Sequence, residues 1–337
     1  MEIKRIGIIH LNQIGDLVFS LTLLRALKEK YPGATIHSIL RPHLKELLIQ
    51  SPFVDKVIDR NKGIKNTLGL LKKIRRGDYD LLISLSNSSE CMFLATFSGA
   101  KVKAGFKHFP WDLVLDAKDK IEGHHSWYNN FKLLKKMGID AQKKDYVGLL
   151  VLPPEGIDPS LFQPQGKYVV ISPGASARRR IKAWEERKFA NLILLLKRTY
   201  GFNPVLVGGR DDVEQVARII DAVREKDDGV QVGPVVNLAG KVGLKDLCYV
   251  LEDASLFVGV DSGVMHLASS LDVPVVGVFG PSDPFYVGPQ NERSAVVREE
   301  MECIPCYLKG CADRTCMKRL DVEKVFDACQ RVLNPQS

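Results

Sequence analysis

The stretch "VGVDSGVMHLASSLDVPVVGVFGPSDP", residues 258–284, contains two short apolar strands separated by a polar turn. The turn is Asp261-Ser262-Gly263-Val264-Met265-His266, and the residues from 264 to 270 have the pattern of a helix. Glycine permits a tight turn, and the first N–H groups of the helix point back toward the strand end, where they attract phosphate. Ser262 and His266 can each donate a further hydrogen bond. The turn is therefore a candidate phosphate site; a simple capped helix with a half-buried histidine is the alternative.

Strands alternate with helices on both sides of this stretch. This alternation predicts parallel sheets covered by helices on both faces, and the proline-rich segment 151–167 predicts a linker between two of them. We therefore predict an α/β protein with two Rossmann-like domains, residues 1–155 and 167–320, joined by the linker 156–166. An amphipathic helix, 321–333, closes the chain. The predicted strands are 5–11, 34–40, 54–58, 80–84, 101–106, 168–174, 203–209, 254–260 and 273–280, and the clearest other helices are 15–33 and 125–137.

Length and composition agree with a two-domain globular protein. The chain has 337 residues, of which 45% are apolar and 26% charged. No apolar run is long enough to span a bilayer, and the first residues, "MEIKRIGIIHLNQIGD", indicate a strand and not a signal peptide. We expect a cytoplasmic protein with reduced cysteines.

The positive charge is concentrated in the first half of the chain. Residues 1–150 hold 25 Lys and Arg against 15 Asp and Glu, whereas the remainder holds 23 against 25. The run from Arg60 to Arg76 has seven basic residues and no acid. Such a run is either a solvated helix face or a surface for an anionic partner, which could be nucleic acid, anionic lipid or an acidic sugar.

Two further segments follow predicted strands. "ASARRRIKAW", 175–184, combines small residues with four cations and could hold a diphosphate without a metal; a basic surface loop is the alternative. Asp16, in "HLNQIGDL" (10–17), is either a stabilising acid at a helix start or a general base. Neither a G-x-G-x-x-G sequence after the first strand nor a P-loop is present, which argues against a dinucleotide-dependent dehydrogenase.

Four cysteines near the end of the chain have the spacing C-x2-C-x4-C-x4-C: Cys303, Cys306, Cys311 and Cys316. Four close thiols suit a tetrahedral structural zinc. Free thiols in a structured loop, or disulfides formed on purification, are the alternatives.

Over nearly its whole length the sequence resembles glycosyltransferase family 9, the ADP-heptose:lipopolysaccharide heptosyltransferases. The resemblance is carried by "IGDLVFSLTLLRALKEKYPGA" (14–34), "SPGASARRRIKAW" (172–184), "DSGVMHLASSLDVPVVGVFGPSDP" (261–284) and "CIPCYLKGCADRTCM" (303–317). It implies a GT-B fold, in which two Rossmann-like domains with parallel sheets face each other across a cleft. It also implies that the C-terminal helix, 321–337, crosses back to the N-terminal domain.

The resemblance assigns roles to individual residues. Asp16 matches the proposed general base, and Lys182 a lysine near the donor phosphates and sugar, which makes these two the catalytic candidates. Asp261 matches an acid that contacts the donor sugar. For the ribose we choose Asp212, with Glu214 as the alternative. The implied donor-binding set is Ser176, Lys182, Asp212, Asp261, Ser262, Gly263, Val264 and His266.

The expected activity is inverting transfer of a heptose from ADP-heptose to the inner core of lipopolysaccharide, whose anionic groups would meet Arg60, Lys62 and Lys65. We expect peripheral contact with the anionic inner leaflet, no nucleic-acid partner, and no cofactor required for catalysis beyond a possible structural zinc. One alternative is a family 9 transferase that uses another nucleotide sugar. The other is a non-catalytic protein that binds nucleotides or nucleic acid.

Overall fold

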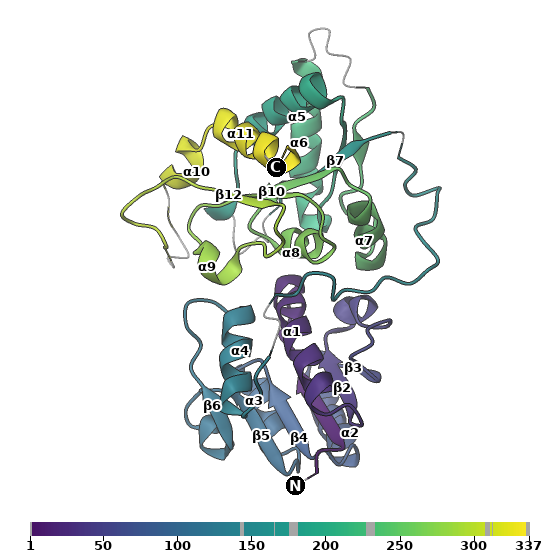
Figure 1. Ribbon diagram of the computed structural model, residues 1–337, viewed down its shortest axis with the longest axis vertical. Coiled ribbons are helices and arrows are strands. Elements are labelled where there is room, and N and C mark those ends of the chain that lie inside the picture. Colours follow the sequence, from purple (N-terminus) through teal and green to yellow (C-terminus); the bar gives the residue numbers. More distant parts are fainter. Residues whose placement is uncertain are drawn as a thin grey trace. The chain divides into compact units, whose positions relative to one another are not determined.

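The chain forms two compact units, Met1–Leu152 and Pro153–Ser337 (Figure 1). The computed structural model describes residues 2–141, 145–164, 166–174, 181–226, 233–306, 311 and 313–334. The boundary lies a few residues before the predicted one, and each unit contains its own sheet.

The first unit is built on a six-stranded sheet with the order β3-β2-β1-β4-β5-β6, in which every pair is parallel. Helix α1 packs against α4, and α2 packs against α3. The strands are β1 (Arg5–Ile9), β2 (Thr35–Leu40), β3 (Lys56–Asp59), β4 (Leu81–Ser84), β5 (Val102–Phe106) and β6 (Ala117–Asp119). The helices are α1 (Ile14–Lys30), α2 (Ile64–Arg76), α3 (Ser89–Thr96) and α4 (Trp127–Lys136), with 3-10 turns η1 (Pro42–Leu47) and η2 (Trp111–Val114).

The second unit repeats this plan with the order β12-β11-β10-β7-β8-β9, again all parallel. Its strands are β7 (Tyr168–Ser172), β8 (Asn203–Leu206), β9 (Val236–Asn237), β10 (Leu256–Val260), β11 (Val275–Val278) and β12 (Ser294–Val297). Its helices are α5 (Glu186–Tyr200), α6 (Val213–Glu225), α7 (Leu244–Glu252), α8 (Gly263–Ser270), α9 (Pro284–Val287), α10 (Thr315–Arg319) and α11 (Val322–Leu333), with the 3-10 turn η4 (Arg210–Asp212). The short strands β6, β9 and β12 were not predicted, because two to four residues carry little periodicity.

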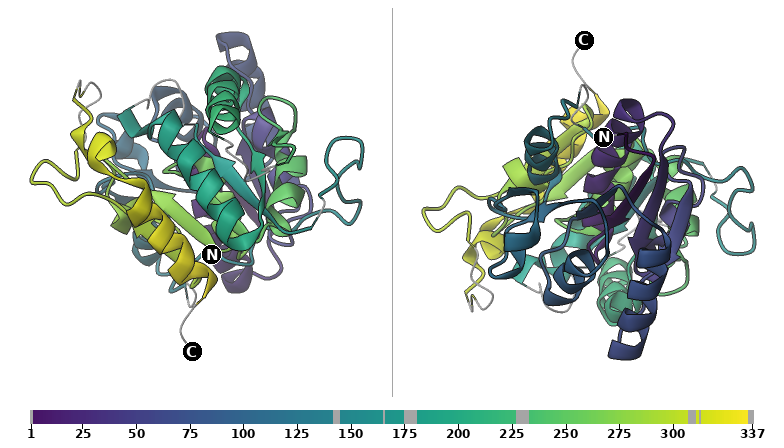
Figure 2. Two further views of the ribbon diagram at one scale, coloured as in Figure 1. Left: turned by 90° about the horizontal axis from the view of Figure 1, so that it is seen from above. Right: turned by 90° about the horizontal axis from the view of Figure 1, so that it is seen from below.

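The C-terminal helix α11 belongs to the second unit, where it runs beside α5 (Figure 2, left). Its buried side chains, which include Val325, Ala328 and Val332, join the core formed by α5, α6 and the sheet. The crossing of the segment 321–337 back to the N-terminal domain stays a prediction, although helix α11 itself packs on the second unit. Its single apolar face is already covered by β11, β12 and α5.

The predicted linker is attached to the second unit. The Tyr249 hydroxyl donates a hydrogen bond to the Pro153 carbonyl, and the Phe162 ring is buried against Tyr168, with ring centroids 5.3 Å apart. The proline-rich segment thus runs along the unit and contributes an aromatic side chain to its core.

Helix α1 is buried along most of its length and packs beside α4, which itself contacts β5 and β6. Other helices, such as α2 and α11, bury one face and expose the other. Within the described ranges, no helix is long and apolar enough to span a bilayer.

In each sheet the strand order reverses at one place. β1 lies beside β4 in the first unit, and β7 lies beside β10 in the second. The loops that follow such neighbouring strands diverge to opposite faces and leave a crevice at the carboxyl edge, where open α/β sheets bind ligands. The segments singled out in the sequence follow β1, β7 and β10, so each begins at one of these two edges.

Candidate functional site

The polar turn after β10 begins helix α8, as the sequence predicts. Ser262 is the residue before the helix, but its side chain does not cap a helical N–H group. The Ser262 hydroxyl is buried and has no hydrogen-bond partner within the described part of the chain. A buried hydroxyl without a partner is costly unless a ligand or water satisfies it. This hydroxyl and the N-terminal N–H groups of α8 are therefore available to bind an anionic oxygen.

Lys182 and Asp261 form a buried ion pair beside this turn, although they lie 79 residues apart in the sequence. Both residues are less than one-tenth exposed. Ser282, from the loop after β11, donates a hydrogen bond to the same carboxylate and is itself buried. The structure thus brings three loops, after β7, β10 and β11, to one charged centre.

The protonation states of this centre follow from its burial. Burial alone would raise the pKa of the Asp261 carboxyl, but the Lys182 ammonium and the Ser282 hydroxyl lower it below its ordinary value. Burial lowers the pKa of His266 to about 4, and Lys182 contributes in the same direction. At neutral pH the centre therefore contains an ionised carboxylate, an ammonium and a neutral imidazole.

Asp212 lies close to the end of β7, whereas Glu214 does not. The Asp212 carboxylate accepts a hydrogen bond of 2.8 Å from the Gly209 N–H group, and burial raises the pKa of this carboxyl. A Cβ atom at Gly174 would lie 2.3 Å from the Asp212 carboxyl group, so the approach depends on glycine there. The Glu214 side chain is 92% exposed. Of the two acids considered for the ribose, only Asp212 reaches the edge of the sheet that carries Lys182.

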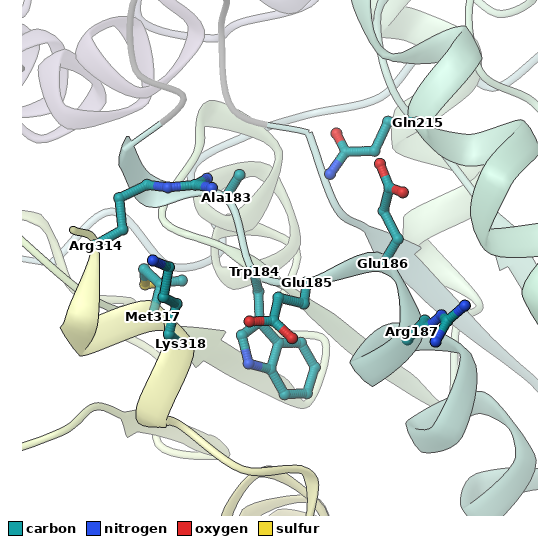
Figure 3. Close-up of a pocket in the computed structure, with 9 residues that line it drawn as sticks. All are labelled: Ala183, Trp184, Glu185, Glu186, Arg187, Gln215, Arg314, Met317 and Lys318. Atoms are coloured by element: carbon teal, nitrogen blue, oxygen red, sulfur yellow. The ribbon is translucent and has the colours of Figure 1, made fainter. Parts of the chain in front are cut away.

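The loop between β7 and Lys182 can be described only in part. Ser176 and the arginines at 178–180 lie outside the described residues. Directly after Lys182, residues 183–187 line a hollow of about 400 Å³ together with Gln215, Arg314, Met317 and Lys318 (Figure 3). This lining mixes acidic and basic side chains, so we assign no phosphate to the hollow.

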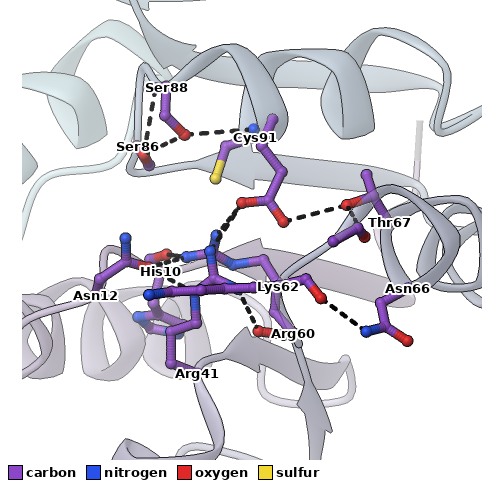
Figure 4. A network of polar contacts seen from close by, with 12 residues as sticks. His10, Asn12, Arg41, Arg60, Lys62, Asn66, Thr67, Ser86, Ser88 and Cys91 are labelled. Carbon is purple, nitrogen blue, oxygen red and sulfur yellow. Dashed lines mark hydrogen bonds and ion pairs between the residues drawn. The ribbon is translucent and has the colours of Figure 1, made fainter.

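In the first unit, a polar network around Glu90 joins Asn12, Arg41 and Arg60 near the ends of the strands, and Figure 4 labels these last three residues. Arg41 and Arg60 each place a guanidinium nitrogen 2.9 Å from the same Glu90 oxygen. Arg60 also donates to the His10 carbonyl at 2.9 Å, and both arginines donate to the Asn12 side chain. Two guanidinium groups against one carboxylate leave one excess positive charge at this edge of the sheet.

Arg60 departs from the expectation of a surface residue. Its side chain is only 1% exposed, because Glu90, 30 residues later in the chain, lies opposite it. Lys62 and Lys65, by contrast, are exposed at the start of α2. Of the three tentative acceptor contacts, only these two lysines present their side chains to solvent.

Asp16 lies in the first turn of α1 and is half-buried. The helix start is held in place by His10, whose ring nitrogens lie 3.0 Å from the Ser20 hydroxyl of α1 and 3.0 Å from the Ser38 hydroxyl of β2. His10 thus fixes α1, and with it Asp16, against the sheet.

We expect acid to destabilise the protein through its buried histidines. The pKa of His10 is lowered to about 3, and those of His125 and His266 to about 4, chiefly by burial. As the pH falls below the unfolded value of about 6.5, the unfolded chain binds protons that the native state does not, so stability falls by up to about 1.4 kcal/mol per pH unit for each histidine. Urea unfolding between about pH 7 and 4.5 measures this slope. His10→Gln retains hydrogen-bonding groups but removes the titrating imidazole. The slope of stability against pH should therefore decrease by the contribution of one proton, and an unchanged slope would contradict the assignment of His10 as a buried neutral histidine.

The cysteine segment packs against the loop that carries Ser282. The Cys306 N–H group donates to the Pro281 carbonyl at 2.7 Å, and a Cβ atom at Gly280 would lie 2.4 Å from the Met317 sulfur. Burial raises the pKa of the Cys316 thiol, and Cys303 and Cys311 act in the same direction. All four are free thiols, with Cys303 exposed. Across the described ranges, no group of three or more His, Cys, Asp or Glu side chains is arranged to hold a metal ion.

Zinc at these cysteines therefore stays a prediction. Protein purified in reducing buffer without chelator should contain about one zinc per chain. Folded, reduced protein with a zinc content near zero would eliminate the metal and leave a packed thiol segment.

Several residues of these centres were not recognised in the sequence. Ser282 follows the strand 273–280 after Pro281, and Arg41 directly follows the strand 34–40. A polar residue at the end of a buried parallel strand is a usable signal, because such ends meet at one edge of a sheet. Glu90 carried no such signal, since it lies inside a helix.

Comparisons with known proteins agree with this arrangement. The sequence profile of glycosyltransferase family 9 (heptosyltransferase) matches residues 67–316. The lipopolysaccharide heptosyltransferase 3 of Escherichia coli K12 is 29% identical over 309 residues, which is 83% of each chain. The solved family 9 glycosyl transferase of Veillonella parvula superposes with a TM-score of 0.82 over 100% of this chain and 99% of the other, at 22% identity. The ADP-heptose LPS heptosyltransferase II of E. coli superposes with a TM-score of 0.77 over 98% and 99%, at 21% identity.

The two solved structures share the paired parallel sheets, which confirms the predicted α/β fold of the GT-B class. The profile match covers well over half of the chain and includes Lys182, Asp212 and the turn from Asp261 to His266. The chain therefore belongs to glycosyltransferase family 9, the heptosyltransferases, and is a glycosyltransferase.

Proposed function

We propose that this enzyme transfers a heptose from ADP-heptose to an acceptor in the inner core of lipopolysaccharide, with inversion at the anomeric carbon. The observation that carries the proposal is the buried centre of Lys182, Asp261 and His266 beside the Ser262 hydroxyl, which has no partner in the described part of the chain. The names of its relatives supply the sugar: one is a lipopolysaccharide heptosyltransferase and another an ADP-heptose heptosyltransferase.

The donor diphosphate would bind at the start of α8. The backbone N–H groups of Gly263 and Val264, the Ser262 hydroxyl and the neutral His266 ring would donate hydrogen bonds to its oxygens. The Lys182 ammonium, held by Asp261, would supply the nearby positive charge. Asp261 would in turn accept a hydrogen bond from a hydroxyl of the donor sugar.

The nucleoside would extend toward the end of β8. There the Asp212 carboxylate, held by the Gly209 N–H group, would accept hydrogen bonds from the ribose hydroxyls. Its position beside Gly174, at the end of β7, supports this choice over the exposed Glu214.

The reaction is a single displacement. Asp16 removes the proton of an acceptor hydroxyl while the oxygen forms a bond to the anomeric carbon and the bond to the ADP oxygen breaks. Negative charge grows on the departing diphosphate, where Lys182 and the α8 N–H groups stabilise it, and the proton remains on Asp16. In this proposal these protein groups suffice at the diphosphate, without a divalent ion.

The acceptor would approach the first unit. Its carboxylates and phosphates would meet Lys62 and Lys65, which are exposed, and the excess of positive charge in residues 1–150. Such an acceptor is lipid-linked, so we place the enzyme at the cytoplasmic face of the inner membrane.

A panel of nucleotide sugars tests the function. ADP-heptose should raise the Tm most, and incubation with a heptose-deficient inner-core acceptor should give a product heavier by one heptose in mass spectrometry. Stronger stabilisation and turnover with a UDP- or GDP-sugar would make the protein a family 9 transferase for another donor. Binding of ADP without turnover of any sugar would indicate a non-catalytic nucleotide-binding protein.

A further inference from the structure

Apolar side chains are exposed on one face of the first unit. In the described part of the chain twelve large apolar residues are exposed, and six of them belong to α2, the end of α3 and the segment around η2. Ile64 is 81% exposed, Phe109 80% and Leu113 71%. Single exposed apolar residues are ordinary, but a concentration on neighbouring elements marks an interaction surface. The six are Ile64, Leu68, Phe97, Phe109, Leu113 and Val114.

These elements lie next to one another. Thr67 of α2 bonds to Glu90 of α3 at 3.4 Å, and Arg75 at the other end of α2 donates to the Phe97 carbonyl at 2.8 Å. The turn η2 packs against α3, and α2 and α3 are seen together in Figure 2, right. We call this surface the α2–η2 face.

The α2–η2 face is strongly basic. The side chains of Lys62, Lys65, Lys72, Arg75 and Lys107 are exposed on its elements. Glu90 is paired with Arg41 and Arg60, whereas Asp112 of η2 and Asp116 remain as carboxylates close to the exposed apolar side chains. The exposed cations therefore outnumber the carboxylates on these elements, and the face carries a net positive charge.

We infer that the α2–η2 face docks on an anionic phospholipid bilayer, with Phe109 and Leu113 inserted into the interface. This inference rests on the proposed function, which requires a lipid-linked acceptor. Cations beside protruding apolar groups match a membrane surface, which offers negative headgroups above an apolar layer. A nucleic acid would use the cations but not Phe109 or Leu113. Side chains that are 70–80% exposed stand out from the surface, as insertion requires.

Co-sedimentation of the full chain with vesicles tests the inference. The protein should pellet with vesicles of phosphatidylcholine and phosphatidylglycerol but not with phosphatidylcholine alone, and salt should release it. Two double variants should each lower the vesicle partition coefficient at least about tenfold: Phe109→Ser/Leu113→Ser and Lys65→Gln/Lys72→Gln. The first removes apolar burial and the second removes charge, and both contribute to the free energy of membrane binding. Trp111 lies in η2, so brominated lipids should quench its fluorescence, and Trp111→Phe should remove that quenching.

Two matched control variants test whether vesicle binding depends on the α2–η2 face. Lys135→Gln/Lys136→Gln changes the same charge on exposed positions of α4, and Phe285→Ser removes a 58% exposed ring from the second unit. Both should bind vesicles as the unchanged protein does. Three results would overturn the membrane assignment. The first is an equal loss of vesicle binding in the α4 variant, and the second is absence of binding to anionic vesicles. The third is a dimer in light scattering that Phe109→Ser/Leu113→Ser dissociates.

The controls also separate this inference from the proposed function. Stabilisation by ADP-heptose and transfer to a detergent-solubilised acceptor should be normal in all these apolar variants. If the unchanged protein fails in transfer, the proposed function is wrong; if only the vesicle experiments fail, the α2–η2 face is wrong.

Discussion

Asp16→Asn should lower kcat by about 10²–10⁴-fold, the usual contribution of a positioned general base. Asp16 is half-buried in the first turn of α1, on a helix that His10 anchors to the sheet. Asparagine retains the shape and a side-chain oxygen but cannot take up the proton. The loss should appear in kcat more than in KM, because proton removal matters only in the transition state.

Folding and donor binding serve as the controls for this variant. Loss of an acid near a helix N-terminus costs about 0.3–1 kcal/mol, so the stability change should match that of Glu323→Gln in the first turn of α11. The affinity for ADP, measured by calorimetry, should be unchanged. A folded Asp16→Asn protein with a nearly normal kcat would show that Asp16 is only a helix-start acid.

Lys182→Met should destabilise the second unit by about 3–5 kcal/mol and weaken ADP binding about 10- to 150-fold. The variant leaves the Asp261 carboxylate buried without its cation, although Ser282 still donates to it. Urea unfolding followed through the buried Trp184, with Trp111 and Trp127 replaced by Phe, would report on this unit alone.

The pH dependence of this variant has a definite sign. With Lys182 present, the lowered pKa of Asp261 stabilises the fold above the unfolded pKa, and this stability is lost as the pH falls. Without Lys182, burial should raise the pKa of Asp261, so protonation relieves the buried charge and the stability deficit should shrink toward acidic pH. A deficit that does not change with pH would contradict the buried-pair assignment.

The double variant Lys182→Met/Asp261→Asn separates stability from function. Removing both charges should restore most of the stability, since replacing a buried ion pair by neutral groups is often nearly neutral. ADP binding should stay weak, because the ammonium is still missing. Recovery of ADP affinity along with stability would mean that Lys182 acts only as the counter-ion of Asp261.

Much of the fold could be predicted from local sequence patterns. Strands buried on both faces must be continuous apolar runs, so segments such as 5–11 and 254–260 were recognisable, and their alternation with helices implies parallel sheets. The turn from Asp261 to His266 was also recognisable as a candidate phosphate site, because glycine and hydroxyl residues directly follow a strand and precede a helix; the same residues also suit a simple capped helix. The packing partner of the last helix could not be predicted. Its apolar pattern shows that one face is buried, but it does not show against which unit.

The sequence by itself determined which segments become strands, where the polar turns follow them, and which residues could meet phosphate or remove a proton. Only the tertiary structure decided which charges are buried together. Arg60 leaves the basic surface because Glu90 of helix α3 lies opposite it, and Lys182 reaches Asp261 across 79 residues. A buried cation is stable only when the fold places a carboxylate next to it. That placement depends on the order of the strands in the sheet, which local sequence patterns do not specify.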